Sequence, residues 1–347
     1  MIVARLLKNA HLRRCAAPFV VQRTSGYASR LMSCAPCIWT FLNSLIRSYF
    51  NSYPGNFSSV RWMGRFRSYL CLCKVKISFF ASLSAAAGLL LSAQSPGSTL
   101  PILTTGVFLV ACGACALNHW QERNTDALMA RTAGRPIPAG IIKSVHALYL
   151  AIILICSGCA VLLSVGAVAP LLGLAAVLWY NGLYTWLKTR TAFAVIPGAL
   201  VGAIPPAMGW IAGGGSLWEP RLAVISFFFF MWQVPHFFIH MLAFGKEYEE
   251  AGLPSLTAVF TGSQLYRLTF QWIIAAAVSL QFVILFGLIQ SPIVRISLFA
   301  ASLWLAMQGI NFMRVRELGY ITVFRRINYF MLIVMLLMFL DKLPAFL

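Results

Sequence analysis

Three oxygen-bearing side chains stand four residues apart in a chain that has few acidic residues. They are Asn118, Glu122 and Asp126, within the stretch NHWQERNTD, and the whole chain has only 8 Asp and Glu among 347 residues. On an α-helix, residues at i, i+4 and i+8 lie on one face, so these oxygens would point into one volume. One amide and two carboxylates, completed by water and phosphate, are ligands that Mg²⁺ prefers. The spacing therefore predicts a magnesium site.

Two arginines follow this motif closely and indicate which kind of ligand binds together with the metal ion. Arg131 and Arg135 follow Asp126 by five and nine residues. A site that only conducts cations would avoid these positive charges, whereas a phosphate site uses them, because guanidinium groups donate paired hydrogen bonds to phosphate oxygens. Carboxylates, a metal ion and arginines together predict a diphosphate-binding pocket.

A second acidic cluster lies in the segment KEYEEAG, which contains Glu247 and Tyr248. It continues from a hydrophobic run that carries WQVPHF, with Trp232, Gln233 and His236 near its middle. Polar groups at that depth of a membrane are costly and usually face a cavity. A solvated loop would explain either cluster alone, but the rarity of acidic residues and the polar residues before the clusters favour a functional site.

Two further segments are expected to face the interior of a helical bundle. In YNGLYTWLKTRT, the residues Tyr180, Tyr184 and Lys188 recur at four-residue spacing, so they share one helical face that ends at a basic terminus. In PGALVGAIPPAMGW, Pro205 and Pro206 break the helix. A membrane protein tolerates such a break only where neighbouring helices or a cavity satisfy the freed carbonyl groups.

The composition places these motifs in a polytopic membrane protein. Hydrophobic residues make up 60% of the chain, charged residues 10%, and the mean hydropathy is +0.81, all outside the range of soluble globular domains. The formal net charge is +19, but no soluble domain presents these charges as a patch. Import and membrane topology explain the surplus better, so we expect the lipid bilayer and no nucleic acid as a partner.

Nine hydrophobic windows are long enough to cross a bilayer, which needs about 20 helical residues. They run at about 77–95, 100–120, 145–166, 168–187, 193–213, 222–244, 266–289, 292–312 and 326–343. With nine spans, 14 of the Lys and Arg from Lys74 onward fall on the side of the N-terminus and 3 on the other. This bias follows the positive-inside rule and would be scrambled by a miscounted span. Both acidic clusters lie on the basic side.

The first 30 residues contain Arg, Lys, Ser and Thr but no acidic residue. This composition is typical of a mitochondrial transit peptide rather than of a secretory signal. We therefore expect residues 1–30 to be a transit peptide, residues 31–66 a basic connector and residues 67–347 the nine-span domain. The protein is expected in the mitochondrial inner membrane, with the basic loops and the acidic clusters facing the matrix.

Taken together, the segments resemble the UbiA-type intramembrane prenyltransferases, and within them the branch that farnesylates heme. The first motif of the family is an Asn with acids at +4 and +8, then Met, Arg-Thr and Arg-Pro, which residues 118–136 match. The heme branch is similar at YT-x-LK, GA-x-x-GA-x-PP-x-x-GW, WQ-x-PHF and an acid-Tyr-x-x-AG loop. The resemblance covers about residues 70–343. At the positions of Glu122 and Glu247 the family usually has Asp. This chain keeps the negative charge there but carries it on a longer side chain.

This resemblance implies an all-α bundle of nine transmembrane helices and a reaction. Farnesyl would pass from farnesyl diphosphate to a vinyl group of heme B, giving heme O on the route to heme A for cytochrome c oxidase, with a heme A synthase downstream. Mg²⁺ would be held by Asn118, Glu122, Asp126 and Glu247 and would act together with Lys188. The implied substrate-binding residues are Arg131, Arg135, Tyr180, Tyr184, Trp232, Gln233, His236 and Tyr248.

Three alternatives compete with this interpretation. A sibling prenyltransferase that acts on 4-hydroxybenzoate for quinone synthesis would share the metal site, but the WQVPHF and YTWLK segments argue against it. A transporter would more naturally carry ionisable residues along a path through the membrane and show an internal repeat. A non-catalytic assembly factor for cytochrome oxidase would not need the metal motif.

Overall fold

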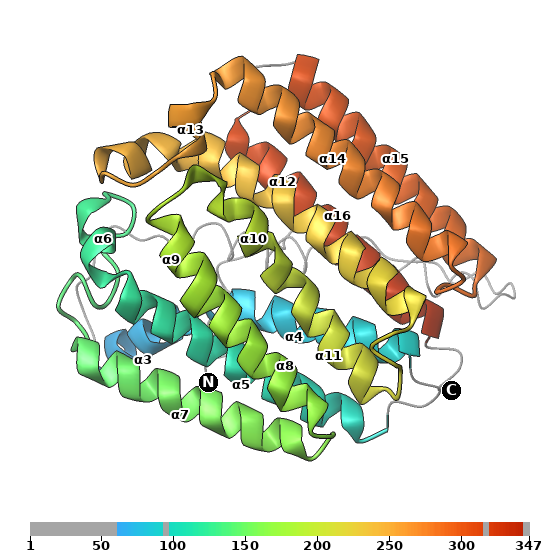
Figure 1. The fold of residues 1–347 in the computed structure, drawn as a ribbon, viewed down its shortest axis with the longest axis horizontal. Helices are drawn as coiled ribbons and strands as arrows, with labels where there is room; N and C mark the ends of the chain where they lie inside the picture. The colour runs from blue at the N-terminus through green and yellow to red at the C-terminus, as the bar shows by residue number, and fades with distance from the viewer. Residues whose placement is uncertain (1–60, 93–96, 315–318, 343–347) are drawn as a thin grey trace, which may run out of the picture. The chain divides into compact units, whose positions relative to one another are not determined.

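The computed structural model describes residues 61–92, 97–314 and 319–342, and these residues form helices and turns without a β-strand. Nine helical segments among them are long and apolar enough to cross a membrane. The predicted all-α bundle of nine spans is therefore confirmed (Figure 1). The expected transit peptide, residues 1–30, and residues 31–60 of the expected connector lie outside the described residues.

The spans differ in regularity. The first three are α4 (Val75–Ser92), α5 (Thr99–Gln121) and α7 (Ser144–Leu163), and the last four are α12 (Pro220–Glu250), α14 (Gly262–Leu285), α15 (Pro292–Arg314) and α16 (Tyr320–Lys342). The fourth joins α8 (Val168–Val177), a π-helical turn η1 (Leu178–Tyr184) and α9 (Thr185–Lys188). The fifth joins η2 (Ala192–Ala194), α10 (Val195–Ala199), the 3₁₀ turn η3 (Leu200–Ala203) and α11 (Ile204–Ala212). Outside the spans lie α3 (Arg61–Leu72), α6 (Arg123–Leu128) and α13 (Leu256–Val259).

The irregular spans have identifiable causes. The fifth span changes to a 3₁₀ turn at residues 200–203, just before the proline pair, and Pro205 and Pro206 lie in the first turn of α11. Proline is tolerated there because its missing N–H would have no helical acceptor. The Trp179 indole N–H donates to the carbonyl of Pro197 at 2.7 Å. The expected break therefore exists, one turn before the prolines rather than at them.

Two glycines bring the first and fifth spans into backbone contact. A Cβ added at Gly209 would lie 1.8 Å from the carbonyl oxygen of Ala85, and one at Gly88 would lie 2.0 Å from the carbonyl oxygen of Pro206. Small residues give transmembrane helices this close approach, since lipid offers no hydrophobic drive to press helices together. The α4–α11 pair is thereby fixed as one wall of the bundle.

On the side of the membrane opposite the predicted site, α16 ends in a buried ion pair. The Asp341 carboxylate accepts the backbone N–H of Ser291 at 2.7 Å and of Gln290 at 3.1 Å, and it lies 3.2 Å from the Lys342 amine. Asp341 and Lys342 are 6% and 8% exposed. This carboxylate therefore holds the turn before α15 against the end of α16.

We expect Asp341→Ala to lower the free energy of unfolding by about 2–4 kcal/mol, because two backbone donors lose their acceptor and a buried amine loses its counter-ion. Unfolding of the detergent-solubilised chain measures it. Glu219→Ala is the control, since Glu219 lies 3.9 Å from Arg221 in an exposed pair, and we expect a change within about 0.5 kcal/mol. Equal changes in the two variants would contradict the anchoring role.

The segments after the second, fourth and sixth spans meet at one end of the bundle. Figure 1 shows α6 and α13 at the end where α9 terminates. One apolar cluster joins Met129 after α6, Val195 in the fifth span, Tyr248 at the end of α12 and Leu256 in α13. This packing places both acidic clusters and the basic end of α9 in one region.

Candidate functional site

The first acidic motif lies where α5 gives way to α6. Asn118 is in the last turn of α5, Asp126 is in α6, and Glu122 stands between the two helices with φ −85° and ψ 4°. The single continuous helix expected over these residues is therefore interrupted at Glu122. Asn118, Glu122 and Asp126 are all buried, at 2%, 8% and 1% exposure.

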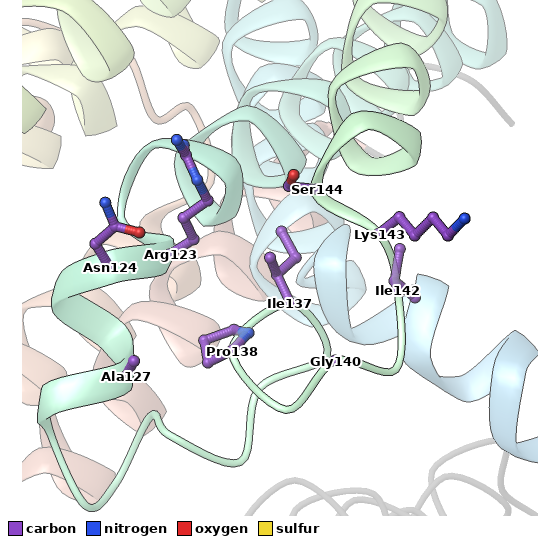
Figure 2. Close-up of a pocket in the computed structure, with 9 residues that line it drawn as sticks. All are labelled: Arg123, Asn124, Ala127, Ile137, Pro138, Gly140, Ile142, Lys143 and Ser144. Carbon is purple, nitrogen blue, oxygen red and sulfur yellow. The ribbon is translucent and has the colours of Figure 1, made fainter.

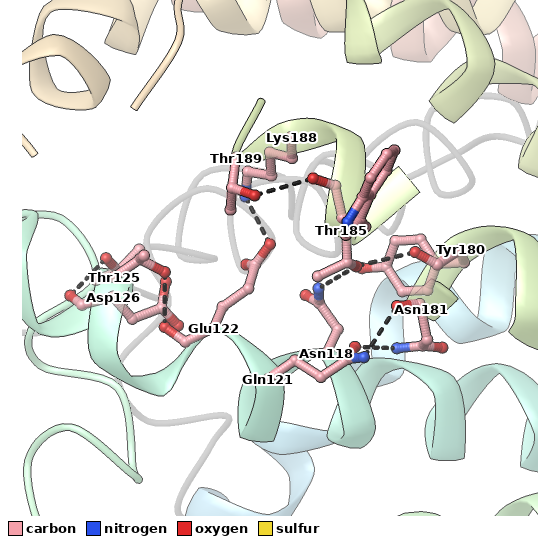
Figure 3. A network of polar contacts seen from close by, with 12 residues as sticks. Asn118, Gln121, Glu122, Thr125, Asp126, Tyr180, Asn181, Thr185, Lys188 and Thr189 are labelled. Carbon is pink, nitrogen blue, oxygen red and sulfur yellow. Dashed lines mark hydrogen bonds and ion pairs between the residues drawn. The ribbon is translucent and has the colours of Figure 1, made fainter. Parts of the chain in front are cut away.

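Glu122 is paired with a lysine from a distant span. The Lys188 amine, at the end of α9, lies 2.8 Å from Oε1 of Glu122 (Figure 3). Burial alone would raise the pKa of Glu122, but the charges of Lys188 and Lys74 outweigh burial and lower this pKa to about 2. Glu122 is therefore a carboxylate at neutral pH, and a fixed cation stands beside it.

Asn118 joins the same network through both ends of its amide. Its Oδ1 accepts a hydrogen bond from the Lys74 amine at 3.1 Å, and its Nδ2 donates to the Thr185 hydroxyl at 3.3 Å. The Thr185 hydroxyl donates to the carbonyl of Tyr180 at 2.9 Å. The amide is thereby held between the start of the first span and the fourth span.

A reciprocal contact fixes the π-helical turn against α5. The Gln121 amide donates to the carbonyl of Asn181 at 2.9 Å, and the Asn181 amide donates to the Gln121 side-chain oxygen at 3.0 Å and to the carbonyl of Ala114 at 3.0 Å. Figure 3 shows this pair beside Asn118. The π turn of the fourth span therefore has polar partners on α5, and Lys188, one turn beyond it, is directed at Glu122.

Asp126 forms a separate pair. Its Oδ2 lies 2.6 Å from the Arg135 guanidinium, while its Oδ1 is buried without a hydrogen-bond partner among the described residues. The Thr132 hydroxyl donates to the Asp126 carbonyl at 2.8 Å and closes the loop. Arg131 instead places its guanidinium over the Phe244 ring of α12, 4.9 Å from the centroid. Of the two predicted arginines, only Arg135 pairs with the motif.

The second acidic cluster meets the first through Lys188. The Lys188 amine lies 5.3 Å from the centroid of the Tyr248 ring, next to Glu247 at the end of α12. Oε2 of Glu247 is buried and has no hydrogen-bond partner within the described part of the chain. Tyr180 and Tyr184 stack at 5.8 Å, and Tyr184 also meets Phe237 at 6.0 Å. Aromatic rings are therefore packed next to the charged end of the bundle.

The polar residues of WQVPHF contact neighbouring helices. The Trp232 indole donates to the carbonyl of Ile327 at 3.1 Å, and Nδ1 of His236 lies 3.1 Å from Oδ1 of Asn328, both on α16. Gln233 packs on Gly202 of the fifth span, where an added Cβ would lie 3.0 Å from its side-chain oxygen. These three contacts tie α12 to α16 and to the fifth span.

Across residues 61–92, 97–314 and 319–342, no three side chains of Asp, Glu, His or Cys gather as a metal-binding group. The three predicted carboxylate ligands are therefore not collected at one point. The donor set nevertheless fits a hard cation, because Oδ1 of Asp126 and Oε2 of Glu247 are buried carboxylate oxygens without a donor. Such oxygens are costly unless a cation or hydrogen-bond donor satisfies them, and Mg²⁺ prefers oxygen ligands.

A separate cavity of about 410 Å³ lies behind α6 (Figure 2). Its walls come from α6, the following loop and the start of α7, and they include Arg123, Asn124, Pro138 and Ser144. Arg123 donates to the carbonyl of Trp120 at 2.7 Å. None of the residues predicted from the sequence to act in catalysis lines this cavity.

Lys74 is one of the site residues that the sequence analysis did not list, as are Thr185, Gln121 and Asn181. It adopts the left-handed conformation, with φ 41°, in the turn between α3 and α4, and its amine reaches Asn118. Such backbone is uncommon for a residue with a side chain. Its segment, LCKVKIS, opens the first span with two lysines before any acidic residue, which is a signal that could have singled it out.

We expect Lys74→Gln to lower kcat/KM for the predicted diphosphate substrate about tenfold to a hundredfold, since the change removes a fixed charge beside Asn118. Steady-state assays of the purified chain measure it. Lys76→Gln is the matched control: Lys76 is exposed and two residues away, so a change below about twofold is expected. Similar losses in both variants would contradict a specific role for Lys74.

A sequence model of the UbiA prenyltransferase family matches residues 81–337. The chain belongs to the UbiA prenyltransferase family. Curated UbiA-type relatives named protoheme IX farnesyltransferase include a protein of Oleidesulfovibrio alaskensis, 33% identical over 283 residues that make up 80% of this chain and 97% of that protein. The relative from Geobacter sulfurreducens is 38% identical over 55% of this chain and 71% of its own length. Protoheme IX farnesyltransferase 2 of Bacillus subtilis is 30% identical over 79% and 93%.

Solved structures of UbiA proteins share the fold. A UbiA homologue from Archaeoglobus fulgidus bound to GPP and Mg²⁺ has a TM-score of 0.62 at 15% identity, over 80% of this chain and 99% of that one. A structure of digeranylgeranylglyceryl phosphate synthase has a TM-score of 0.64 at 16% identity, over 81% and 99%. The predicted family, the UbiA-type bundle and the assignment as a transferase are therefore confirmed.

Proposed function

We propose that this chain is a heme farnesyltransferase, which transfers farnesyl from farnesyl diphosphate to a vinyl group of heme B and yields heme O. The observation that carries the donor half is the partly buried ion pair of Lys188 and Glu122 at 2.8 Å, beside Asn118 and the second acidic cluster. The relatives named protoheme IX farnesyltransferase support the acceptor half.

The reaction separates charge, and the site carries charge to meet it. The bond between C1 of farnesyl and the diphosphate oxygen breaks, the vinyl carbon attacks the allylic cation, and water adds to the resulting cation with loss of a proton. The leaving diphosphate accumulates negative charge. Cations that are already in place stabilise this charge and lower the barrier. Lys188 and Arg135, each within 2.8 Å of a carboxylate, would transfer hydrogen bonds to its oxygens, with Arg131 nearby.

Mg²⁺ is the metal ion proposed for this site. Asn118, Glu122, Asp126 and Glu247 would hold it, and it would neutralise the leaving diphosphate when bound. Glu122 stays ionised because its pKa is about 2, so it offers a charged oxygen at neutral pH. The buried oxygens of Asp126 and Glu247 without donors offer two more.

The apolar part of the substrate would lie among aromatic rings. Tyr180, Tyr184 and Tyr248 border the charged end, where their π faces would stabilise the allylic cation and their packing would exclude water that would quench it. Trp232, Gln233 and His236 are assigned to the heme side. Their contacts with α16 and the fifth span support an indirect contribution, in which they hold the wall that heme would meet.

We place the protein in the mitochondrial inner membrane, with the site facing the matrix and a heme A synthase as the acceptor of its product. The basic, acid-free first 30 residues and the excess of Lys and Arg on one side of the membrane support this location. Both acidic clusters share that basic side. Fractionation of cells that express the tagged full chain, followed by protease protection of inner-membrane vesicles, tests the location and the orientation.

Competing acceptors test the proposed reaction. Membranes that contain the chain would be incubated with radiolabelled farnesyl diphosphate, Mg²⁺ and either heme B or 4-hydroxybenzoate. We expect label only in a heme product with the mass of heme O. Prenylated 4-hydroxybenzoate without labelled heme would replace this function by quinone synthesis, and label in neither acceptor would remove both prenyl-transfer functions.

A further inference from the structure

The helix α3 lies outside the nine spans and has two different faces. On one face Ser68 and Leu72 are buried, at 4% and 0% exposure. On the other face Phe66 is 67% exposed and Leu70 is 41% exposed, with Arg65 and Arg67 exposed beside them. A short helix that shows apolar and basic side chains on its outer face is typical of a membrane interface.

The packing of α3 fixes its depth. Leu72 belongs to an apolar cluster with Ile142, Ala147 and Ala151. Because α7 begins at Ser144, these alanines lie in its first and second turns, where the span enters the membrane. Figure 1 shows α3 beside that end of α7. The α3 helix also leads directly into the first span through Cys73 and Lys74, so its outer face meets the boundary between lipid and water.

The charge of this boundary region is positive throughout. Lys143, exposed at the start of α7, follows Ile142 and adds a third basic side chain to Arg65 and Arg67. No acidic residue occurs in the sequence before Glu122, so α3 itself carries no carboxylate that would neutralise them. Basic side chains next to a membrane attract anionic headgroups.

We propose that α3 is a binding surface for anionic phospholipids on the basic side of the membrane. Arg65, Arg67 and Lys143 would contact headgroup phosphates, and Phe66 and Leu70 would insert among the upper acyl chains. The exposed apolar pair argues for a bilayer rather than for a soluble anion, since a free phosphate would leave Phe66 and Leu70 in water. The surface is independent of which acceptor the enzyme prenylates.

The surface is also connected to the site. The last residue of α3, Leu72, is two positions from Lys74, whose amine reaches Asn118. Lipid that holds α3 in place would therefore also hold the turn from which Lys74 reaches the first acidic motif. Binding of anionic lipid is expected to stabilise this end of the bundle, which gives a readout that needs no substrate.

A lipid titration tests the proposal. The full chain, purified in a neutral detergent, would be titrated with phosphatidylglycerol or with phosphatidylcholine of the same acyl chains while its thermal unfolding midpoint is measured. We expect phosphatidylglycerol to raise the midpoint at low mole fraction and phosphatidylcholine to have little effect. In the double variant Arg65→Gln/Arg67→Gln, about tenfold or more phosphatidylglycerol should be required for the same rise.

Two further variants and one soluble anion complete the test. Arg221→Gln removes an exposed arginine on the opposite side of the membrane and should respond like the unaltered chain. Phe66→Ser should weaken the response while both arginines remain. An equal response of the double variant, a full response of Phe66→Ser, or the same rise with inorganic phosphate alone would each overturn the proposal.

Discussion

Lys188→Gln is expected to lower the turnover of prenyl transfer roughly a hundredfold to a thousandfold, the loss typical when one preorganised charge-stabilising donor is removed. Lys188 contacts both acidic segments, because its amine lies 2.8 Å from Glu122 and 5.3 Å from the Tyr248 ring. Glutamine keeps the hydrogen-bonding capacity and removes the charge. Single-turnover assays with saturating farnesyl diphosphate measure the effect.

Arg190→Gln is the matched control for this variant. Arg190 lies two residues beyond Lys188 on the exposed end of the same span, with its guanidinium 4.4 Å from the Trp186 ring. We expect a change below about threefold. Lys188→Arg should recover part of the activity, since it restores a charge. A Lys188→Gln enzyme that stays folded and works within threefold of the unaltered chain would contradict the role of this cation.

Gly209→Ala is expected to lower the free energy of unfolding by about 3 kcal/mol or more. Its new Cβ would lie 1.8 Å from the Ala85 carbonyl oxygen and 2.7 Å from the Leu89 nitrogen, both backbone atoms that cannot rotate away. The first and fifth spans would have to separate, and the cluster of α4, α5, α7, α8 and α11 side chains around Met208 would open. Unfolding in detergent micelles, followed by circular dichroism, measures the change.

Gly262→Ala serves as the control for Gly209→Ala. A Cβ at Gly262 meets no atom within 4 Å, and this residue is the first of α14, so we expect no loss and a gain of up to about 1 kcal/mol. Equal stability of Gly209→Ala and the unaltered chain would show that α4 and α11 are not held in backbone contact.

Most of the architecture follows from hydropathy alone. Nine apolar windows and the one-sided distribution of Lys and Arg predict nine spans, and the structure has nine among its described residues. The boundaries move by a few residues: the sixth span, expected at about 222–244, runs on as α12 to Glu250. Charged residues end an apolar window, but they do not end the helix, because water solvates them where the helix extends beyond the membrane.

Local spacing described the first motif less well. Periodicity predicts that Asn118, Glu122 and Asp126 share a face, but the backbone leaves the helix at Glu122. Asp126 pairs with Arg135, while Glu122 pairs with Lys188. A pattern of residue types predicts which residues form a helix. It does not predict at which residue the helix is interrupted.

The sequence alone did not predict contacts between residues that lie far apart in the chain. Lys74 and Asn118 are separated by 44 residues and Lys188 and Glu122 by 66. His236 illustrates a different difficulty, because a polar residue in a span looks the same in sequence whether it faces a cavity or a neighbouring helix. Its contact with Asn328 shows that α16 is its partner.

The central claim is that the site around Glu122 makes heme O. The most direct measurement is to express the chain, Glu122→Gln and Asp126→Asn in a bacterial strain that lacks heme O, to extract the hemes and to identify them by mass. We expect heme O from the unaltered chain and none from either variant at equal levels of membrane-inserted protein. Heme O from both variants would contradict the assignment of the site, and its absence from a well-expressed unaltered chain would contradict the reaction.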